Sequence, residues 1–174
     1  MGIEIERKFL VKDDSWRPYA QSPHQLTQGY LSTSPQCTVR IRQEISPSGQ
    51  RSWLTLKGAG TGIVRPEFEY VIPWEDGIQM MELLGQREPL KKNRYRVEFR
   101  GHIWEVDEFL GVNAGLVVAE ITLREASETF DVPQWAGQEV SDDPRYLNSR
   151  LYEIPYKLWD PATPLAGNTP KASP

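Results

Sequence analysis

Apolar and polar residues alternate in seven segments of this chain, with the period of two that is typical of β-strands whose two faces have different surroundings. The segments span residues 2–12, 37–45, 51–57, 65–73, 91–100, 103–110 and 116–124. Two connections between them, residues 46–49 (Ser-Pro-Ser-Gly) and 100–102 (Arg-Gly-His), contain residues suited to tight turns. The pattern therefore predicts a mostly antiparallel sheet.

A few helices are expected to flank this sheet. Asp76 can cap a helix that carries Ile78, Met81 and Leu84, an irregular helix is expected within 133–151, and a shorter one within 14–20. Residues 161–174 are rich in Pro, Ala, Thr and Ser and have almost no apolar bulk, which predicts a disordered tail. The sequence thus predicts one α+β domain over residues 1–160.

The polar face of the predicted strands is charged at most positions. Its members are Glu4, Glu6, Lys8, Arg40, Arg42, Thr55, Lys57, Glu67, Glu69, Lys92, Arg94, Arg96, Glu98, Glu105, Asp107, Glu120, Thr122 and Arg124. A sheet with one solvated and one packed face is the simplest explanation. However, acids and bases gather on separate strands, which suggests two ligands, a cation for the acids and an anion for the bases.

Closure of the sheet would turn this charged face into the lining of a tunnel. A barrel of about eight strands is wide enough to hold one small ligand, although a strongly curved open sheet would produce the same alternation. Carboxylates suit hard divalent metals such as Mg²⁺, and arginine forks suit phosphate oxygens. A metal-bound chain of several phosphates is the best chemical match to both sets.

Composition narrows the compartment and the partners. A net charge of −4 and a pI near 5.3 argue against a general nucleic-acid binder. Cys37 is the only cysteine, so no intramolecular disulfide can form and a reducing compartment is expected. No stretch approaches the roughly 20 apolar residues of a membrane helix, and no signal-peptide pattern is present. We expect a cytoplasmic protein without a membrane partner; a homodimer is kept as one option for its assembly.

Several short motifs occur in a fixed order along the strands. They are residues 4–8 (Glu-Ile-Glu-Arg-Lys), 40–42 (Arg-Ile-Arg), 56–58 (Leu-Lys-Gly), 67–69 (Glu-Phe-Glu), 92–94 (Lys-Asn-Arg), 106–107 (Val-Asp) and 119–121 (Ala-Glu-Ile). Together they resemble the CYTH, or triphosphate tunnel metalloenzyme, superfamily, which includes bacterial inorganic triphosphatases, class IV adenylyl cyclases and thiamine triphosphatases. The resemblance covers residues 2 to about 159 and is greatest to the compact bacterial triphosphatases.

The resemblance implies an antiparallel eight-stranded β-barrel in which Mg²⁺ or Mn²⁺ supports hydrolysis of tripolyphosphate to pyrophosphate and phosphate. It implies that Lys8 and Tyr30 act together on the attacking water. Carried over by position, the metal ligands are Glu4, Glu6, Asp107 and Glu120; the phosphate-binding residues are Arg40, Arg42, Lys57, Lys92 and Arg94; and Glu67 and Glu69 are further tunnel acids.

Two positions depart from the family pattern. Thr122 stands where a second glutamate is usual, and Leu110 stands where an acid often follows the Asp-x-Phe element. The number of metal ions that the site binds, one or two, is therefore left undetermined by the sequence. The alternatives are a class IV adenylyl cyclase, a thiamine or nucleoside triphosphatase, and a polyphosphate-binding module with weakened catalysis.

Other signals have ordinary explanations. Residues 58–62 (Gly-Ala-Gly-Thr-Gly) lack the ending of a phosphate loop and are expected to be a flexible strand connection. His24 and His102 are expected on the surface, and the six tryptophans are expected mostly in the core.

Overall fold

The structure is a computed structural model that describes residues 2–159, so the expected tail at 161–174 lies outside the described residues. Within this range the chain forms ten strands: β1 (Glu4–Val11), β2 (His24–Ser34), β3 (Cys37–Ser46), β4 (Gly49–Gly58), β5 (Val64–Arg65), β6 (Glu67–Ile72), β7 (Leu90–Phe99), β8 (His102–Phe109), β9 (Val117–Thr122) and β10 (Ala136–Glu139). The helices are α1 (Trp74–Leu84), α2 (Asn148–Glu153) and the 3-10 turns η1 (Arg17–Tyr19), η2 (Gly111–Asn113), η3 (Pro144–Tyr146) and η4 (Tyr156–Leu158).

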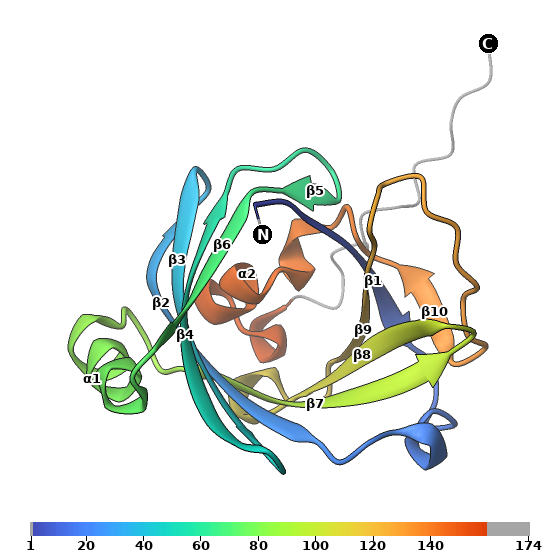
Figure 1. Cartoon of the computed structure of the whole chain (residues 1–174), viewed down its shortest axis with the longest axis horizontal. Coiled ribbons are helices and arrows are strands. Elements are labelled where there is room, and N and C mark those ends of the chain that lie inside the picture. The colour runs from blue at the N-terminus through green and yellow to red at the C-terminus, as the bar shows by residue number, and fades with distance from the viewer. Residues whose placement is uncertain (1, 160–174) are drawn as a thin grey trace.

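All strands belong to one antiparallel sheet with the order β10-β1-β9-β8-β7-β2-β3-β4-β6, and β5 pairs with β1. The sheet curls on itself, and Figure 1 looks into the resulting ring. Its two sides meet where the backbones of Gly2 and Glu67 exchange hydrogen bonds of 3.0 and 3.2 Å. Seven of the strands correspond to the seven alternating segments, β2 completes the eight expected for the barrel, and the short β5 and β10 raise the number to ten. The shape is therefore a barrel-like tunnel whose ladder is not continuous all round.

The cross-strand register places the charged positions on the inner face. Lys8 is paired with Glu120, and Arg94 with Asp107, so these side chains point to the same side of the sheet. The two turns expected from the sequence are present, since Ser46 pairs with Gly49 and Phe99 with His102. The second turn is made by two residues with positive φ, of 47° and 80°, as tight hairpins require.

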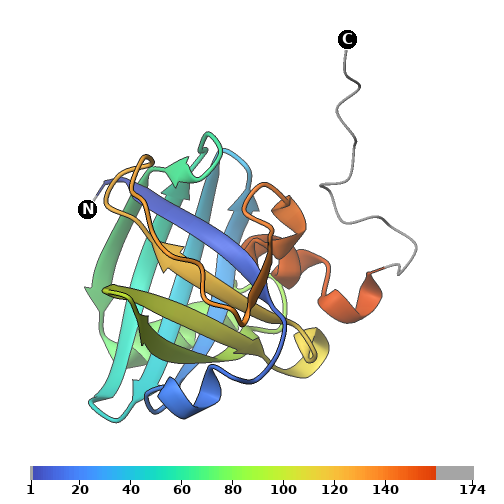
Figure 2. The same ribbon diagram turned by 90° about the vertical axis from the view of Figure 1, so that its right-hand side faces the viewer.

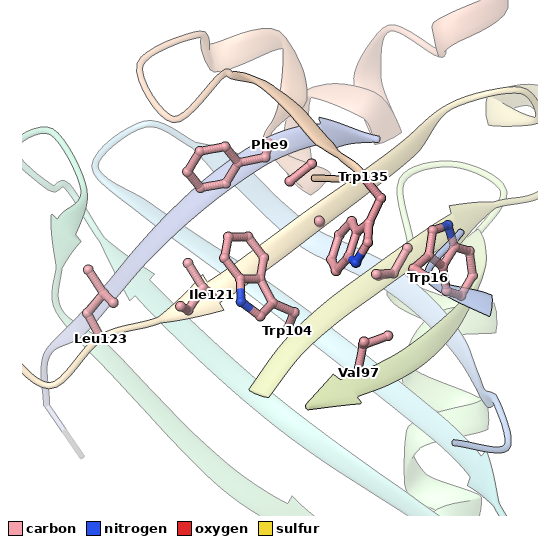
Figure 3. Packing of buried hydrophobic residues seen from close by; sticks show 10 residues of the cluster. Phe9, Trp16, Val97, Trp104, Ile121, Leu123 and Trp135 are labelled. Atoms are coloured by element: carbon pink, nitrogen blue, oxygen red, sulfur yellow. The ribbon is translucent and has the colours of Figure 1, made fainter. Parts of the chain in front are cut away.

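The apolar positions of β1, β7, β8 and β9 form a core on the outside of the ring. Trp104 lies at its centre, with ring centroids 5.4 Å from Phe9 and 5.7 Å from Trp135, both in edge-on arrangements (Figure 3). Trp16, just before η1, is fully buried in the same cluster. The segment expected to be a helix over 14–20 forms only the single turn η1, and its role is to cover this core.

Helix α1 packs on the outside of β2, β3 and β4. It begins after Pro73 rather than at an Asp76 cap, and Ile78, Met81 and Leu84 all lie within it. Gly29 lets it approach β2, because a Cβ at that position would lie 2.7 Å from Met81 Cγ. Strand β2 was not among the seven alternating segments, since contact with α1 on one side and the tunnel on the other removes a polar face.

The irregular helix expected within 133–151 is present only in the second half of that region. That region forms β10, η3 and the start of α2, and β10 joins the sheet beside β1. In Figure 2, α2 lies at one side of the curved sheet. Leu151 on α2 is fully buried, and Tyr152 packs on the inward-facing Tyr30 with ring centroids 5.0 Å apart. Apolar packing against α2 thus fills one end of the tunnel and leaves the charged positions in the remainder.

Candidate active site

Two adjoining cavities are lined by the charged inner face. The first cavity, of about 340 Å³, is lined by Gly2, Ile3, Glu4, Glu6, Gln28, Arg40, Arg42, Lys57, Glu67, Glu69, Arg94, Glu105, Glu120, Thr122 and Asn148. The second cavity, of about 540 Å³, shares Glu6, Arg40, Lys57 and Asn148 with the first and adds Lys8, Tyr30, Arg65 and parts of the segments 58–63 and 141–150. Most residues expected in the site therefore do come together.

Lys8 lies between two carboxylates from neighbouring strands. Its Nζ donates to Glu120 at 2.5 Å and also to Glu6. All three side chains are nearly buried, so the ammonium compensates the charge of acids that would otherwise repel each other. Burial lowers the pKa of Lys8 despite Glu120; burial raises that of Glu120, but Lys8 and Arg94 bring it well below its usual range.

Arg94 joins three acids of the adjacent strands. Its Nε and Nη2 each donate to Asp107 at 2.7 Å, and Nη2 also reaches Glu120 at 2.6 Å, while Nη1 pairs with Glu105. Burial opposes the charge of this guanidinium, but Asp107 and the other acids raise its pKa well above the usual value. The fork geometry of arginine makes such a multiple contact possible.

Lys92 and Asp107 lie behind this cavity wall. Their charged groups form an ion pair with both side chains at 0% exposure, and neither residue lines either cavity. Lys92 Nζ also donates to Asn148 on α2 at 3.3 Å. Burial lowers the pKa of Lys92 to about 8, against the opposing effect of Asp107. The pair expected to contact metal and phosphate is enclosed by protein.

The opposite wall carries a second group of ion pairs. Lys57 Nζ lies 2.7 Å from Glu4 and 3.4 Å from Glu67, and Arg65 Nε lies 3.3 Å from the same Glu4 oxygen. Burial raises the pKa of Glu4, but Lys57 outweighs it and brings the pKa to about 2. Glu4 is therefore ionised throughout the neutral range.

Arg42 is held on this wall by Glu69 and by an aromatic ring. Its Nη2 donates to Glu69 at 2.9 Å, and its guanidinium stacks 4.6 Å from the centroid of Trp53. Trp53 pairs with Arg42 in the sheet, so it lies on the inner face rather than in the expected core. The Nε atoms of Arg40 and Arg42 are buried without a hydrogen-bond partner within the described residues. These donors suit an anion in the first cavity.

Tyr30 belongs to the wall of the second cavity. Its side chain is 3% exposed, and burial raises its pKa, while Arg40 acts in the opposite direction. Lys8 lines the same cavity. The two residues expected to act on water thus face one space.

The acids of the first cavity have the right chemistry for a hard divalent metal, because Glu4, Glu6, Glu105 and Glu120 offer only carboxylate oxygens. Across β8 and β9, Glu105 pairs directly with Glu120. Within residues 2–159 no three Asp, Glu, His or Cys groups are clustered closely enough to form a metal site, since lysine and arginine side chains lie between the acids.

The two departures from the family pattern have different locations. Thr122 lines the first cavity and pairs with Glu6, so a glutamate there would add a carboxylate beside the other acids. Leu110 follows the end of β8 and is 39% exposed, and it lines none of the cavities described here. An acid at this position would therefore not have added a carboxylate to either cavity.

Several polar residues that line the cavities had no role expected from the sequence, among them Gln28, Arg65, Glu105 and Asn148. Glu105 lies two residues from Asp107, and Arg65 lies two residues from Glu67. Strand periodicity could therefore have placed both on the inner face. Gln28 lies on the unrecognised strand β2, and Asn148 reaches the site only because α2 folds against the inner face, so neither had a local signal.

The two histidines are partly buried and each contacts a glutamate. His24 Nδ1 lies 3.0 Å from Glu44, and His102 Nε2 lies 3.2 Å from Glu128. No helix within the described residues is long and apolar enough to cross a membrane.

Comparison with known proteins agrees with this geometry. The CYTH domain model matches residues 2–149. An inorganic triphosphatase of Acetivibrio thermocellus is 44% identical over 157 residues, which cover 90% of this chain and 97% of the relative, and one of Nitrosomonas europaea is 34% identical over 85% and 95%. The crystal structure of the inorganic triphosphatase NE1496 superposes with a TM-score of 0.59 at 30% identity, covering 86% of this chain and 93% of the other. The chain therefore belongs to the CYTH domain family.

Proposed function

We propose that this protein hydrolyses inorganic tripolyphosphate to pyrophosphate and orthophosphate in the first cavity. The observation that carries the proposal is the set of four cationic side chains, Arg40, Arg42, Lys57 and Arg94, that line a cavity also bordered by carboxylates. A tripolyphosphate chain offers oxygens for the cations, and its metal ion offers a partner for the acids. The curated relatives named inorganic triphosphatase support the same substrate.

The protein's contribution is positioning and charge neutralisation, as is general for phosphoryl transfer. The arginines and Lys57 bind the phosphate chain, and Lys8 and Tyr30 orient a water molecule toward the terminal phosphorus. The water oxygen bonds to that phosphorus, and the bridging P–O bond breaks. Pyrophosphate keeps the electron pair, and the proton released from water passes to solvent.

We further propose that Glu4, Glu6 and Glu120, which pair with Lys8 and Lys57 in this structure, would come together to hold Mg²⁺ or Mn²⁺, and the metal would neutralise charge on the phosphate oxygens when bound. Asp107 was expected among these ligands, but its side chain is fully buried and lines neither cavity. We assign it the role of orienting Arg94. The compartment proposed is the cytoplasm, where a lone cysteine stays reduced.

The test is phosphate release from tripolyphosphate, ATP and thiamine triphosphate in parallel, each with Mg²⁺ and with Mn²⁺. The proposal expects tripolyphosphate to have the highest kcat/KM. Preference for ATP or thiamine triphosphate would instead support an organic triphosphatase, cyclic AMP from ATP would support a cyclase, and binding without release would support a polyphosphate-binding module.

Lys8→Ala tests the roles within the site. It should lower kcat by about 100-fold or more, because general acid–base and water-positioning groups contribute at least that much. Lys12→Ala is the matched control, since Lys12 lies just after the same strand and is exposed. Near-normal turnover in folded Lys8→Ala would remove Lys8 and Tyr30 from the mechanism.

A further inference from the structure

The second cavity is larger than the first and has its own walls. One side is the connection 58–63 between β4 and β5, and the other is the segment 141–150 that leads into α2. Ala59 and Asp142 on these two sides are exposed, so the cavity reaches solvent between them. The glycine-rich connection, which sequence analysis left without a role, is therefore the rim of a cavity.

The two cavities divide the site residues between them. Arg42 and Arg94 line only the first, whereas Lys8 and Tyr30 line only the second. Arg40 and Lys57 line both and mark the boundary. A phosphate chain held by the arginines of the first cavity would thus have its terminal group at this boundary.

Hydrolysis at the terminal phosphorus is expected to proceed by in-line displacement. The attacking and leaving oxygens lie on opposite sides of the phosphorus, so the transferred group moves toward the nucleophile as the bridging bond breaks. With water oriented by Lys8 and Tyr30, orthophosphate forms on the side of the second cavity. Pyrophosphate stays with the arginines of the first.

The charge of the second cavity suits orthophosphate. Five cationic side chains line it, Lys8, Arg40, Lys57, Arg65 and Arg150, against the two carboxylates of Glu6 and Asp142. Arg65 and Arg150 lie outside the first cavity, and Arg150 is half-exposed at the rim. Lys8, Lys57 and Arg65 also pair with acids of the tunnel wall, and Arg150 pairs with Glu153 at 2.7 Å. A doubly charged anion would share these cations with their acids, and their succession from the boundary to the solvent would hold it and then pass it on.

We propose that the second cavity is a binding site and exit route for orthophosphate, while tripolyphosphate enters and pyrophosphate leaves by the first cavity. This inference rests on the proposed function and on the roles proposed for Lys8 and Tyr30. It assigns a task to Arg65, to Arg150 and to the connection 58–63.

The test uses chemical modification of the folded protein to narrow one cavity at a time. Ala59→Cys and Ile3→Cys are made in a Cys37→Ser background, so that each variant has one thiol, at the rim of the second or the first cavity respectively. Methanethiosulfonate reagents of increasing size then form a mixed disulfide that a reductant removes. Recovery on reduction separates obstruction from damage to the fold.

With Ala59→Cys, bulky modification should lower kcat for tripolyphosphate at least about fivefold and leave KM unchanged or lower, because release becomes limiting. Rapid acid quench should show a burst of orthophosphate approaching about one equivalent per site. With Ile3→Cys, the same reagent should raise KM without a burst. Arg150→Gln should weaken inhibition by added orthophosphate while KM stays unchanged.

The proposal would be overturned if modification raised KM in Ala59→Cys and lowered kcat with a burst in Ile3→Cys. It would also be overturned if modification of Ala59→Cys had no effect and Arg150→Gln were inhibited by orthophosphate as strongly as the wild type. These outcomes differ from failure of the proposed function, in which the unmodified protein releases no orthophosphate from tripolyphosphate.

Discussion

Replacing Lys92 by methionine should stabilise the protein at neutral pH, although it removes one member of a buried ion pair. Burial lowers the pKa of Lys92 from 10.5 to about 8 even beside Asp107, so keeping this ammonium charged in the folded protein is unfavourable. At 1.36 kcal/mol per pKa unit, the difference corresponds to about 3 kcal/mol below pH 8. Methionine has no proton to bind and fills a similar volume.

The usual cost of breaking a buried pair should not apply here. That cost arises when the remaining charge is left uncompensated. Asp107 keeps two hydrogen bonds of 2.7 Å from Arg94, and within residues 2–159 Lys92 forms an ion pair with Asp107 alone. Glu120, on which the charge of Lys92 also acts, keeps Lys8 and Arg94 as partners. Lys92→Met is therefore expected to be more stable than the wild type at pH 7, by an amount up to about 3 kcal/mol.

The pH dependence of the stability difference follows from the lowered pKa of Lys92. Because the folded state binds this proton less tightly than the unfolded chain does, wild-type stability rises relative to the variant between pH 8 and 10.5. The full free-energy cost of keeping Lys92 charged in the folded protein is present below pH 8 and is gone above pH 10.5. The difference between the two proteins should therefore shrink toward zero across that window.

Urea unfolding at pH 7, 8, 9 and 10 measures this difference, and Lys91→Met controls for loss of a lysine on the exposed side of β7. A variant that is less stable than the wild type at pH 7, with a gap that does not change with pH, would refute the reasoning. So would an equal effect of Lys91→Met.

Three further outcomes are expected. Thr122→Glu should tighten Mg²⁺ or Mn²⁺ binding measured by calorimetry, and unchanged affinity would place this position away from the metal. Trp53→Leu should lower kcat/KM for tripolyphosphate roughly 2- to 30-fold, the equivalent of about 0.5–2 kcal/mol of lost stacking on Arg42, whereas Trp53→Phe should retain most of it; an equal loss in both would exclude stacking. Gly29→Val should lower the thermal midpoint because its side chain would meet Met81, while Gly49→Ala, with open space around it but a positive φ, should cost only about 1 kcal/mol.

The sequence was sufficient for those parts of the fold in which each strand has one polar and one apolar face. Glu6, Lys8 and Glu120 could be placed on one surface because strand periodicity fixes the side to which each points. Their pairing across β1 and β9 could not be predicted, since cross-strand register depends on contacts between segments more than 100 residues apart.

Other parts of the site lacked any local signal. Strand β2 is buried on both sides, so its sequence shows no clean alternation, and it supplies Tyr30 and Gln28. Asn148 enters the cavity wall from a six-residue helix whose position depends on packing against the inner face. Trp53 is an exception to the expectation that the tryptophans lie mostly in the core, and its parity with Thr55 and Lys57 was a signal for the inner face.

The place of β1 in the sheet also affects how the protein can be made. Apart from the short β5, the partners of this first strand are β9 and β10, which are synthesised only after more than 100 further residues. At about 5–20 residues per second, the ribosome needs roughly 5–20 s to supply them. During that interval the acids and the lysine of β1 have no tunnel to line, and its apolar side has no core. Such non-local pairing favours slow folding after release, with a nascent strand that chaperones would need to shield.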